Sequence, residues 1–453
     1  MEEESKGKFS GKIGYVLATA GSAVGLGNIW RFPYMAAKYG GGMFLLVYVL
    51  LVITLGFTMV LTETTLGRKT GKSAIDAFGS LAPKAGWIGW IHAVVPCLIL
   101  PYYSVIGGWV LKYFFSYLTG GGKALASDSA FTAFISSPGE PVLFFAVFIV
   151  LTALIVVKGV ENGIEKASKV MMPLLVILTV IVAIFSMTRP GAGAGVKYYL
   201  VPNFSNFSFQ SLLGAMGQMF YSLSISMGIL VTYGSYMKKD VPLSSSVKQV
   251  IFFDTAIAFL AGLMVIPAVF AFSGGNPEAL KKGPSLLFIT LPKVFDSMKG
   301  IGTFMGALFF LLVFFAAITS SISLFEAVVS ILRDKTGFTR KKASVIVLLW
   351  SLVVGTLTSL GFGPLASVHL LGFDLLDFFD FITNSVLMPI AAFCTCIFVS
   401  KVVGVQAIDK EVECSSPFRE KKLYNGFITF LAPFCIIAIL VSSVMEGLGF
   451  LAF

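Results

Sequence analysis

Long apolar runs recur along the whole chain of 453 residues, and they restrict the folds that this sequence can adopt. An apolar run of about 18 residues or more is long enough to cross a bilayer as a helix. Charged residues make up only 12% of the chain, whereas soluble domains carry about 25%. The sequence lacks the segments of about ten alternating residues that form the strands of an outer-membrane barrel. It therefore predicts an all-α polytopic membrane protein.

The apolar runs predict about eleven transmembrane helices. The predicted spans are residues 13–36, 42–66, 87–118, 141–158, 168–187, 208–236, 246–272, 302–332, 343–361, 372–400 and 422–449. The N-terminal stretch MEEESKGKFSGK has mixed charge and no small-residue cleavage site. We therefore expect a cytoplasmic tail before a retained span rather than a signal peptide.

Basic residues are distributed unevenly between the two sets of loops. If the N-terminus is cytoplasmic, twenty-three lysines and arginines fall in the cytoplasmic loops or at the span ends beside them, and eight fall in the opposite loops. This bias follows the positive-inside rule, so the net charge of +10 sets the orientation of the chain. We expect a multi-pass protein of the plasma (inner) membrane with a cytoplasmic N-terminus. The lipid bilayer is its expected partner, and nucleic acid is not.

Two of the predicted spans contain helix breakers. The first carries GSAVGLGN at residues 21–28, and the sixth carries YSLSISMG at residues 221–228. An unpaired backbone group in hydrocarbon costs several kcal/mol, so such breaks need a partner. Glycines can also serve close helix packing, which is the expectation for Gly302 and Gly306 in GTFMG.

The two breaks occupy corresponding positions if spans 1–5 and 6–10 form two halves of opposite orientation. Paired breaks of this kind indicate an inverted-repeat transporter with a site at mid-membrane, where helices 1 and 6 are unwound. The expected organisation is a first five-helix repeat with the N-terminal tail (residues 1–187) and an inverted second repeat (188–401). A cytoplasmic loop and an eleventh helix (402–453) follow.

Catalytic and metal-binding patterns are missing from the sequence. His92 and His369 are the two histidines, and neither has a cysteine at metal-ligand spacing. A lone histidine near a membrane interface is usually structural. We find no nucleophile–base pair and no phosphate-binding loop, so we do not expect an enzyme.

The broken spans resemble those of the neurotransmitter:sodium symporter family. AGSAVGLGNIWRFPY resembles the first span of that family, YYSVIGGW the third, GQMFYSLSISMG the sixth and FFAAITSSISL the eighth. The resemblance runs from about Lys6 to the tenth span. The eleven-span count is similar to that of bacterial members that carry several hydrophobic amino acids. The resemblance implies sodium-driven uptake of amino acids by alternating access.

The resemblance also implies two sodium sites, built from oxygen atoms that the breaks release. One sodium would lie among Gly21, Val24, Ala316, Thr319 and Ser320. The other would take Ala23, Asn28, Ser222 and Asp254. Hydroxyls in a helix can instead bond to the carbonyl four residues earlier. That alternative suits Ser321 and Ser323 better than Thr319 and Ser320.

Asp254 departs from the family, which commonly has asparagine in this position. Animal members bind chloride nearby, which offsets the sodium charge. We expect the Asp254 carboxylate to supply that charge permanently, so that chloride is not needed. A carboxylate in the middle of a span costs about 2.5–3.5 kcal/mol on insertion scales, so it needs a partner. When sodium has left, Asp254 would take up a proton for the return step.

The substrate site that the resemblance implies lies between the two breaks. The substrate carboxylate would meet the Leu26 and Gly27 amides at the positive end of a half-helix, and Tyr103 would donate its hydroxyl. The ammonium group would meet the carbonyls of Ala23, Tyr221 and Ser222 and the Ser224 hydroxyl.

The class of substrate depends on Gly25 and on the side-chain pocket. Gly25 stands where monoamine carriers have aspartate, so it leaves room for the carboxylate of an α-amino acid. The side chain would contact Ile99, Tyr103, Tyr221, Met227, Ser320 and Leu324. This pocket is mostly apolar, and the flexibility of Met227 would admit hydrophobic side chains of several sizes.

Gates are expected on both sides of the site. On the outer side, Arg31 would pair with Asp377, although Asp374 and Asp380 lie three residues away on either side. Gln218 would brace Arg31, and Tyr221 would cover the site. On the inner side, Lys6 or Lys8 would pair with Asp334. Phe9 and Tyr236 would act as plugs there.

Gly163 and Pro173, ten residues apart, mark an expected hinge. One interpretation is an ordinary loop-to-helix turn in which Pro173 causes a kink. The other is a turn that unwinds and lets water reach the sodium near Gly21 and Thr319.

Other functions stay open from the sequence alone. A proton-coupled or uncoupled amino-acid exchanger of the same fold is the first alternative, although it would lack the sodium-ligand set named above. A sensor that binds amino acids without moving them is the second. The sequence does not give the oligomeric state.

Overall fold

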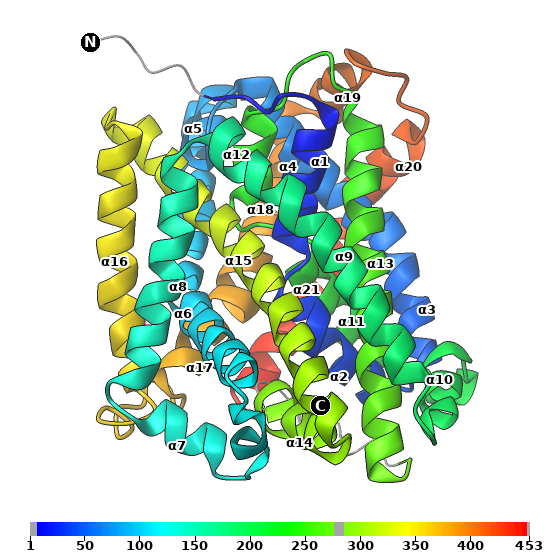
Figure 1. Ribbon diagram of the computed structural model, residues 1–453. Helices are drawn as coiled ribbons and strands as arrows, with labels where there is room; N and C mark the ends of the chain where they lie inside the picture. The colour runs from blue at the N-terminus through cyan, green and yellow to red at the C-terminus, as the bar shows by residue number, and fades with distance from the viewer. Residues whose placement is uncertain (1–6, 276–284, 451–453) are drawn as a thin grey trace.

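The computed structural model describes residues 7–275 and 285–450, and these residues form a bundle of helices (Figure 1). The first half contains α1 (Lys12–Ala23), η1 (Gly27–Arg31), α2 (Phe32–Lys38), α3 (Gly42–Leu51), η2 (Val52–Gly56), α4 (Phe57–Thr70), α5 (Ala74–Leu81), α6 (Gly86–Leu118), η4 (Gly121–Ala126), α7 (Ala130–Ser136), α8 (Glu140–Val157), η5 (Val160–Glu165) and α9 (Lys166–Met187). The described residues contain two isolated β-bridges and otherwise only helices and loops, so the fold is all-α as predicted.

The second half begins with α10 (Ala192–Leu200), α11 (Phe209–Ser222), α12 (Ile229–Ser235), α13 (Leu243–Ser273), η8 (Leu286–Thr290), α14 (Leu291–Ser297), α15 (Gly300–Thr336) and α16 (Arg340–Leu360). It ends with α17 (Leu375–Asp380), η9 (Phe381–Leu387), α18 (Met388–Ile397), η10 (Phe398–Val403), α19 (Val405–Glu413), α20 (Lys421–Gly426), η11 (Phe427–Leu431) and α21 (Ala432–Gly447). Here η marks short turns of 3-10 or π-helix.

The long helices agree with the predicted spans. Within the described residues, nine helices are long and apolar enough to cross a membrane, or ten if the bent pair at the start of the chain counts as one span. That pair, Lys12–Ala23 and Gly27–Lys38, bends by 55°. The remaining predicted span, 208–236, is formed by α11 and α12, each too short to cross alone.

The first break lies where glycines interrupt the helix. At Val24 the backbone is extended (φ −74°, ψ 92°), and helical structure resumes at Gly27. Val24 and Leu26 are buried, so the break lies inside the protein rather than on its outer surface.

The second break, between Ser222 and Ile229, contains residues with left-handed backbone conformation. Ser224, Ser226 and Gly228 have φ angles of 54°, 64° and 68°. A left-handed conformation costs a non-glycine residue about 1–3 kcal/mol and persists only where the surroundings enforce it. The Glu63 carboxylate of α4 does so, because it accepts bonds from the Ser226 amide (2.9 Å) and hydroxyl (3.2 Å).

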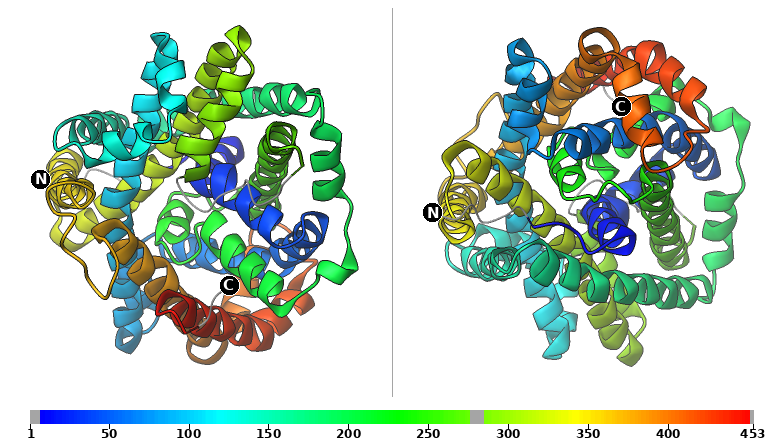
Figure 2. Two further views of the ribbon diagram at one scale, coloured as in Figure 1. Left: turned by 90° about the horizontal axis from the view of Figure 1, so that it is seen from below. Right: turned by 90° about the horizontal axis from the view of Figure 1, so that it is seen from above.

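Both broken spans lie in the middle of the bundle. The dark-blue α1 is enclosed by other helices when the molecule is seen from either end (Figure 2). α12 is buried over its whole length, and α1 packs against α9, α13 and α15. We call the end where α1 begins, together with α5, α19 and α20, the N-terminal face; α7, α14 and α17 lie at the opposite face (Figure 1).

Candidate functional site

A small cavity lies between the two breaks. It is lined by Ser22, Ala23, Gly25, Leu26, Gly27, Asn28, Ile99, Tyr103, Tyr221, Ser222, Ser224, Met227, Ile229, Ser320 and Leu324. These include all twelve residues that the sequence assigns to the substrate site. Ser22 and Ile229 are additional lining residues, which the motifs did not single out.

Polar groups in the cavity wall bond to one another. The Leu26 amide donates to the Tyr103 hydroxyl at 3.3 Å, and the Ser224 hydroxyl donates to the Ser22 carbonyl at 3.3 Å. None of the described lining residues carries a charged side chain. The wall thus offers amide and hydroxyl donors and carbonyl acceptors, which match a zwitterion, beside an apolar side.

Gly25 is placed where a side chain would not fit. A Cβ atom at this position would lie 2.7 Å from the Ser320 hydroxyl oxygen and 3.0 Å from that of Tyr103. The cavity has a volume of about 30 Å³, and about 10–15 Å³ of such space is enough for one water molecule. An amino acid can therefore enter only if lining side chains move outward.

Asp254 forms a buried polar cluster beside the cavity. Its Oδ1 atom accepts from the Asn28 amide at 2.7 Å and from the Ser222 hydroxyl at 2.8 Å. Its Oδ2 atom accepts from the Tyr48 hydroxyl at 3.4 Å. The structure thus brings Asn28, Ser222 and Asp254 together and adds Tyr48, which the motifs did not indicate. The carboxylate and hydroxyl oxygens are buried and suit a cation such as sodium.

The second predicted cation position lies between α1 and α15. The Ser320 hydroxyl is 3.4 Å from the carbonyl oxygens of both Gly21 and Val24. The Thr319 hydroxyl is 3.2 Å from the Ala316 carbonyl. Thr319 also donates to the Phe315 carbonyl, four residues earlier, at 2.8 Å. It therefore makes the helix-internal bond that the sequence assigned to Ser321 and Ser323, yet its oxygen still has acceptor capacity.

Arg31 lies over the ring of Tyr221, which lines the cavity. The Arg31 guanidinium carbon lies 5.2 Å from the centre of the Tyr221 ring. The Gln218 amide donates to the Gly27 carbonyl at 3.1 Å, so it contacts the first break directly, whereas the sequence suggested a brace for Arg31. The pairing of Arg31 with Asp377 stays a prediction.

The two other acidic candidates for this gate form hydrogen bonds with residues other than Arg31. Asp374 caps α17 by accepting from the Asp377 amide at 2.8 Å. Asp380 accepts from the Tyr102 hydroxyl at 3.3 Å and from the Asn384 amide at 2.6 Å.

Aromatic residues pack together near the N-terminal face, where the sequence predicts plugs. The Phe9 ring is buried and packs edge-on against Tyr15, Tyr233 and Tyr236, with centroids 5.5 to 6.1 Å apart. The Tyr236 hydroxyl donates to the Glu326 carboxylate at 2.6 Å.

Two further charged residues contact this aromatic group, and the predicted pairing of Lys6 or Lys8 with Asp334 stays a prediction. Arg340 of α16 forms an ion pair with Glu326. Lys6 lies outside the described residues, and Lys8 is exposed. Asp334 accepts from the Ser73 amide at 2.8 Å. Glu326 lies within α15 and Arg340 at the start of α16, and neither was singled out because no motif contains it.

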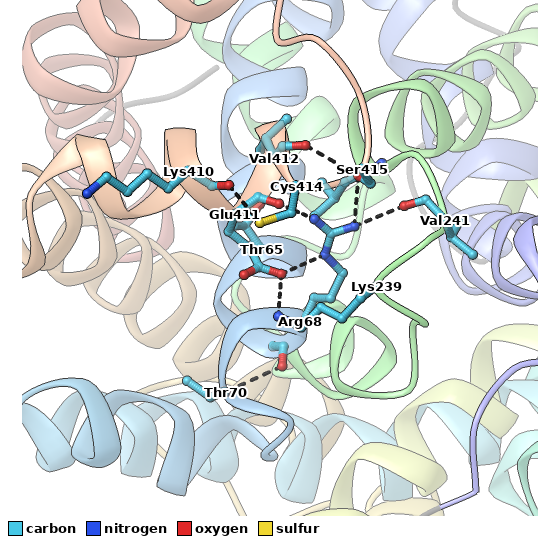
Figure 3. A network of polar contacts seen from close by, with 12 residues as sticks. Thr65, Arg68, Thr70, Lys239, Val241, Lys410, Glu411, Val412, Cys414 and Ser415 are labelled. Carbon is cyan, nitrogen blue, oxygen red and sulfur yellow. Dashed lines mark hydrogen bonds and ion pairs between the residues drawn. The ribbon is translucent and has the colours of Figure 1, made fainter.

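Arg68, at the end of α4, forms a second polar cluster on this face (Figure 3). Its guanidinium donates to the Glu411 carboxylate at 2.9 Å, the Val241 carbonyl at 2.9 Å and the Ser415 hydroxyl at 3.1 Å. Lys239 reaches the same carboxylate at 2.6 Å. The cluster ties α19 and the loop before α13 to α4.

The expected hinge coincides with a π-helical turn. Gly163 lies in η5, where a Cβ atom would be 2.2 Å from the Ile155 carbonyl oxygen, and Pro173 lies inside α9. Glu165, in the same turn, accepts from the Ser10 amide at 2.8 Å. The turn is thereby joined to the N-terminal segment that precedes α1.

Together, the paired breaks and the cavity between them define a multi-pass membrane transporter built on discontinuous helices. The chain belongs to the sodium:neurotransmitter symporter family, whose model matches residues 6–126 and 123–449. This confirms the family that the motifs of four spans indicated. It is a family of transporters and not of enzymes.

The relatives include proteins of bacteria and animals. The chain is 36% identical to the sodium-dependent transporter YhdH of Bacillus subtilis, over 98% of each chain. It is 26% identical to the human sodium- and chloride-dependent GABA transporter 2, over 94% of this chain and 78% of that one. Its structure is similar to the crystal structure of MhsT in complex with L-phenylalanine, with a TM-score of 0.87 and 36% identity, over 97% of this chain and 100% of that one.

Proposed function

We propose that this protein is a sodium-coupled symporter that takes up hydrophobic L-amino acids by alternating access. The observation that carries the proposal is the cavity between the breaks, with polar groups for a zwitterion at one side and apolar residues at the other. The similarity to MhsT, crystallised with L-phenylalanine, supports the same class of substrate.

Within this site, each end of the substrate has a set of groups. The Leu26 and Gly27 amides and the Tyr103 hydroxyl bind the carboxylate, for which Gly25 leaves space. Carbonyls of Ala23, Tyr221 and Ser222 and the Ser224 hydroxyl bind the ammonium group. The side chain lies against Ile99, Met227 and Leu324, together with Tyr103, Tyr221 and Ser320.

Two sodium ions travel with the substrate. One binds Ala23, Asn28, Ser222 and Asp254, and the other binds Gly21, Val24, Ala316, Thr319 and Ser320. The buried Asp254 carboxylate, which is fully removed from solvent, supports chloride independence because it already balances one sodium charge. On the return step, Asp254 carries a proton in place of sodium.

The N-terminal face is cytoplasmic in this proposal, and the membrane is the plasma (inner) membrane. Two sodium ions entering with a zwitterion carry two charges inward. At about 100 mV this supplies about 4.6 kcal/mol, from about 2.3 kcal/mol per charge. At about 1.4 kcal/mol per tenfold change, the potential alone supports roughly thousandfold accumulation. A returning proton on Asp254 lowers that figure.

The two five-helix repeats (residues 1–187 and 188–401) surround the site, and residues 402–453 add the last helix. During transport, Arg31 with Asp377 and Tyr221 close the outer side. Phe9, Tyr236, Asp334 and the N-terminal lysines close the inner side. The turn at Gly163 and Pro173 unwinds to let sodium leave.

Uptake into proteoliposomes tests the proposal. The purified protein is reconstituted, and uptake of labelled L-leucine and L-phenylalanine is measured with and without an inward sodium gradient, with chloride replaced by gluconate. We expect accumulation above the equilibrium level only with the sodium gradient. Competition by all twenty amino acids then defines the substrate range.

The same assay separates the alternatives. An exchanger takes up label without sodium when the vesicles are preloaded with amino acid, and it responds to a proton gradient if it is proton-coupled. A sensor binds amino acid but shows no uptake. Either result would replace the proposed symport.

A further inference from the structure

Ile229 lines the cavity but belongs to none of the motifs that indicated the substrate site. It is the first residue of α12, directly after the break in span 6, and only 1% of its surface is exposed. Met227, two residues earlier, lies in the break and lines the same cavity. The cavity wall at this point thus combines an irregular segment with the start of a helix.

Gly228 fixes the place at which α12 begins. Its backbone is left-handed (φ 68°), and a Cβ atom there would lie 2.8 Å from the His92 carbonyl oxygen of α6. Its own carbonyl accepts from the Thr232 amide at 3.0 Å, which is an intrahelical bond at the start of α12. Glycine meets both conditions without strain, so the chain passes close to α6 immediately before Ile229.

α12 also contacts α4 backbone to backbone. A Cβ atom on Gly67 of α4 would lie 1.9 Å from the Val231 carbonyl oxygen, and one on Gly234 of α12 would lie 2.3 Å from the Thr64 carbonyl oxygen. Small residues let two helices approach this closely in a membrane. Side chains between helices can change rotamer, whereas touching backbones leave no such room to adjust. α12 is therefore held in position, and Ile229 is held with it.

Ile229 and Met227 differ in how far they can yield to a ligand. Isoleucine is branched at Cβ, and inside a helix it keeps one χ1 rotamer in about 90% of cases. Methionine is unbranched, has three rotatable bonds and fills irregular gaps. Met227 also stands between two left-handed residues, Ser226 (φ 64°) and Gly228 (φ 68°), outside the helices. When a ligand expands the cavity, Met227 can adapt, whereas Ile229 stays in place.

We propose that Ile229 is a specificity-determining residue, whose fixed side chain sets the largest substrate side chain that the pocket accepts. The pocket then has an adaptable wall at Met227 and a rigid wall at Ile229. The inference rests on the proposed amino-acid site. It predicts that a shorter residue 229 extends the substrate range toward larger side chains, without changing the groups that bind carboxylate, ammonium or sodium.

Equilibrium binding of amino acids to the full-length protein tests this role. Binding of labelled L-leucine at saturating sodium is competed with unlabelled L-leucine and with unlabelled L-tryptophan, in the wild type and in Ile229→Ala. The measured quantity is the ratio of the two dissociation constants for each protein. A change of one methylene in an apolar pocket discriminates by about tenfold or more. Because alanine leaves only a methyl group, we expect the ratio to shift toward tryptophan by at least about tenfold.

Leu230→Ala is the matched control. Leu230 is equally buried at 1% exposure, and it is not among the described residues that line the cavity. The substitution removes a similar apolar side chain from the same helix and should keep the wild-type ratio. A ratio of two ligands on one protein does not change when the folded fraction falls, so loss of stability alone cannot produce the expected shift.

An unchanged ratio in Ile229→Ala would refute the role of Ile229 while leaving the amino-acid site in place. An equal shift in Leu230→Ala would count against it as well, because the effect would then belong to the helix as a whole. If Ile229→Ala does not fold, the milder Ile229→Val decides: a smaller shift toward tryptophan is expected, and no shift would overturn the role. Wild-type protein that binds neither ligand would instead overturn the proposed function, and this inference with it.

Discussion

Replacing Asp254 with asparagine removes a buried negative charge and keeps the shape of the side chain. The carboxylate accepts from Asn28 at 2.7 Å, Ser222 at 2.8 Å and Tyr48 at 3.4 Å. In the variant, these three donors remain without a charged acceptor. The asparagine that replaces Asp254 has only one acceptor oxygen, because its NH₂ group donates, so it can accept from only some of these three donors.

If sodium binds beside Asp254 as proposed, the substitution removes one member of a buried charge pair, and this sets the size of the effect. Removing such a partner costs about 3–5 kcal/mol. At about 1.4 kcal/mol per tenfold change, the apparent affinity for sodium should fall by roughly 100-fold to 3,000-fold in chloride-free buffer. Chloride should restore much of it, because an anion can accept from the three donors that Asp254 leaves.

The assay is sodium-driven uptake into proteoliposomes, with sodium varied and chloride either present or replaced by gluconate. Asp240→Asn makes the same chemical change at an exposed site and should behave like the wild type. Unchanged chloride-free transport in Asp254→Asn would refute the reasoning. Loss of transport that chloride does not rescue would show that the carboxylate does more than supply charge.

Three further substitutions test other parts of the structure. Gly163→Ala places a Cβ atom 2.2 Å from a backbone carbonyl and should slow sodium release, measured as tracer efflux; an unaltered rate would count against the hinge. Arg68→Ala removes the buried hydrogen bonds of the guanidinium while Lys239 still pairs with Glu411, so it should lower the free energy of unfolding by about 1.5–3 kcal/mol, whereas the neighbouring Lys69→Ala should not; thermal unfolding measures both. Gly25→Ala pushes against the Ser320 hydroxyl 2.7 Å away and should weaken amino-acid binding by about tenfold or more, or about 1.4 kcal/mol; equal binding would show that Gly25 is not next to the ligand.

The fold was predictable because its main signals are local in the sequence. Long apolar runs give the spans, and glycines at short intervals give the breaks. The lining of the cavity was also predictable, since its residues belong to the motifs around Gly25, Tyr103, Tyr221 and Ser320. The sequence could not show that Thr319 bonds within its own helix. A threonine that bonds to its own helix and one that binds a ligand look the same in a sequence.

Contacts between distant segments were not predictable from one sequence. Glu63 and Ser226 are separated by 163 positions, and Arg68 and Glu411 by 343. No periodic pattern links such pairs, and each residue alone has an ordinary structural explanation.

If the cavity is the proposed amino-acid site, its small volume disfavours small substrates. Every amino acid must push the same side chains apart, so the work of expansion is nearly constant. The compensating gain grows with the apolar area that the ligand hides from water, at about 25 cal/mol per Å². This free-energy gain is small for glycine and alanine and larger for leucine or phenylalanine. Discrimination against small substrates would then be an energetic threshold, requiring no group that repels them.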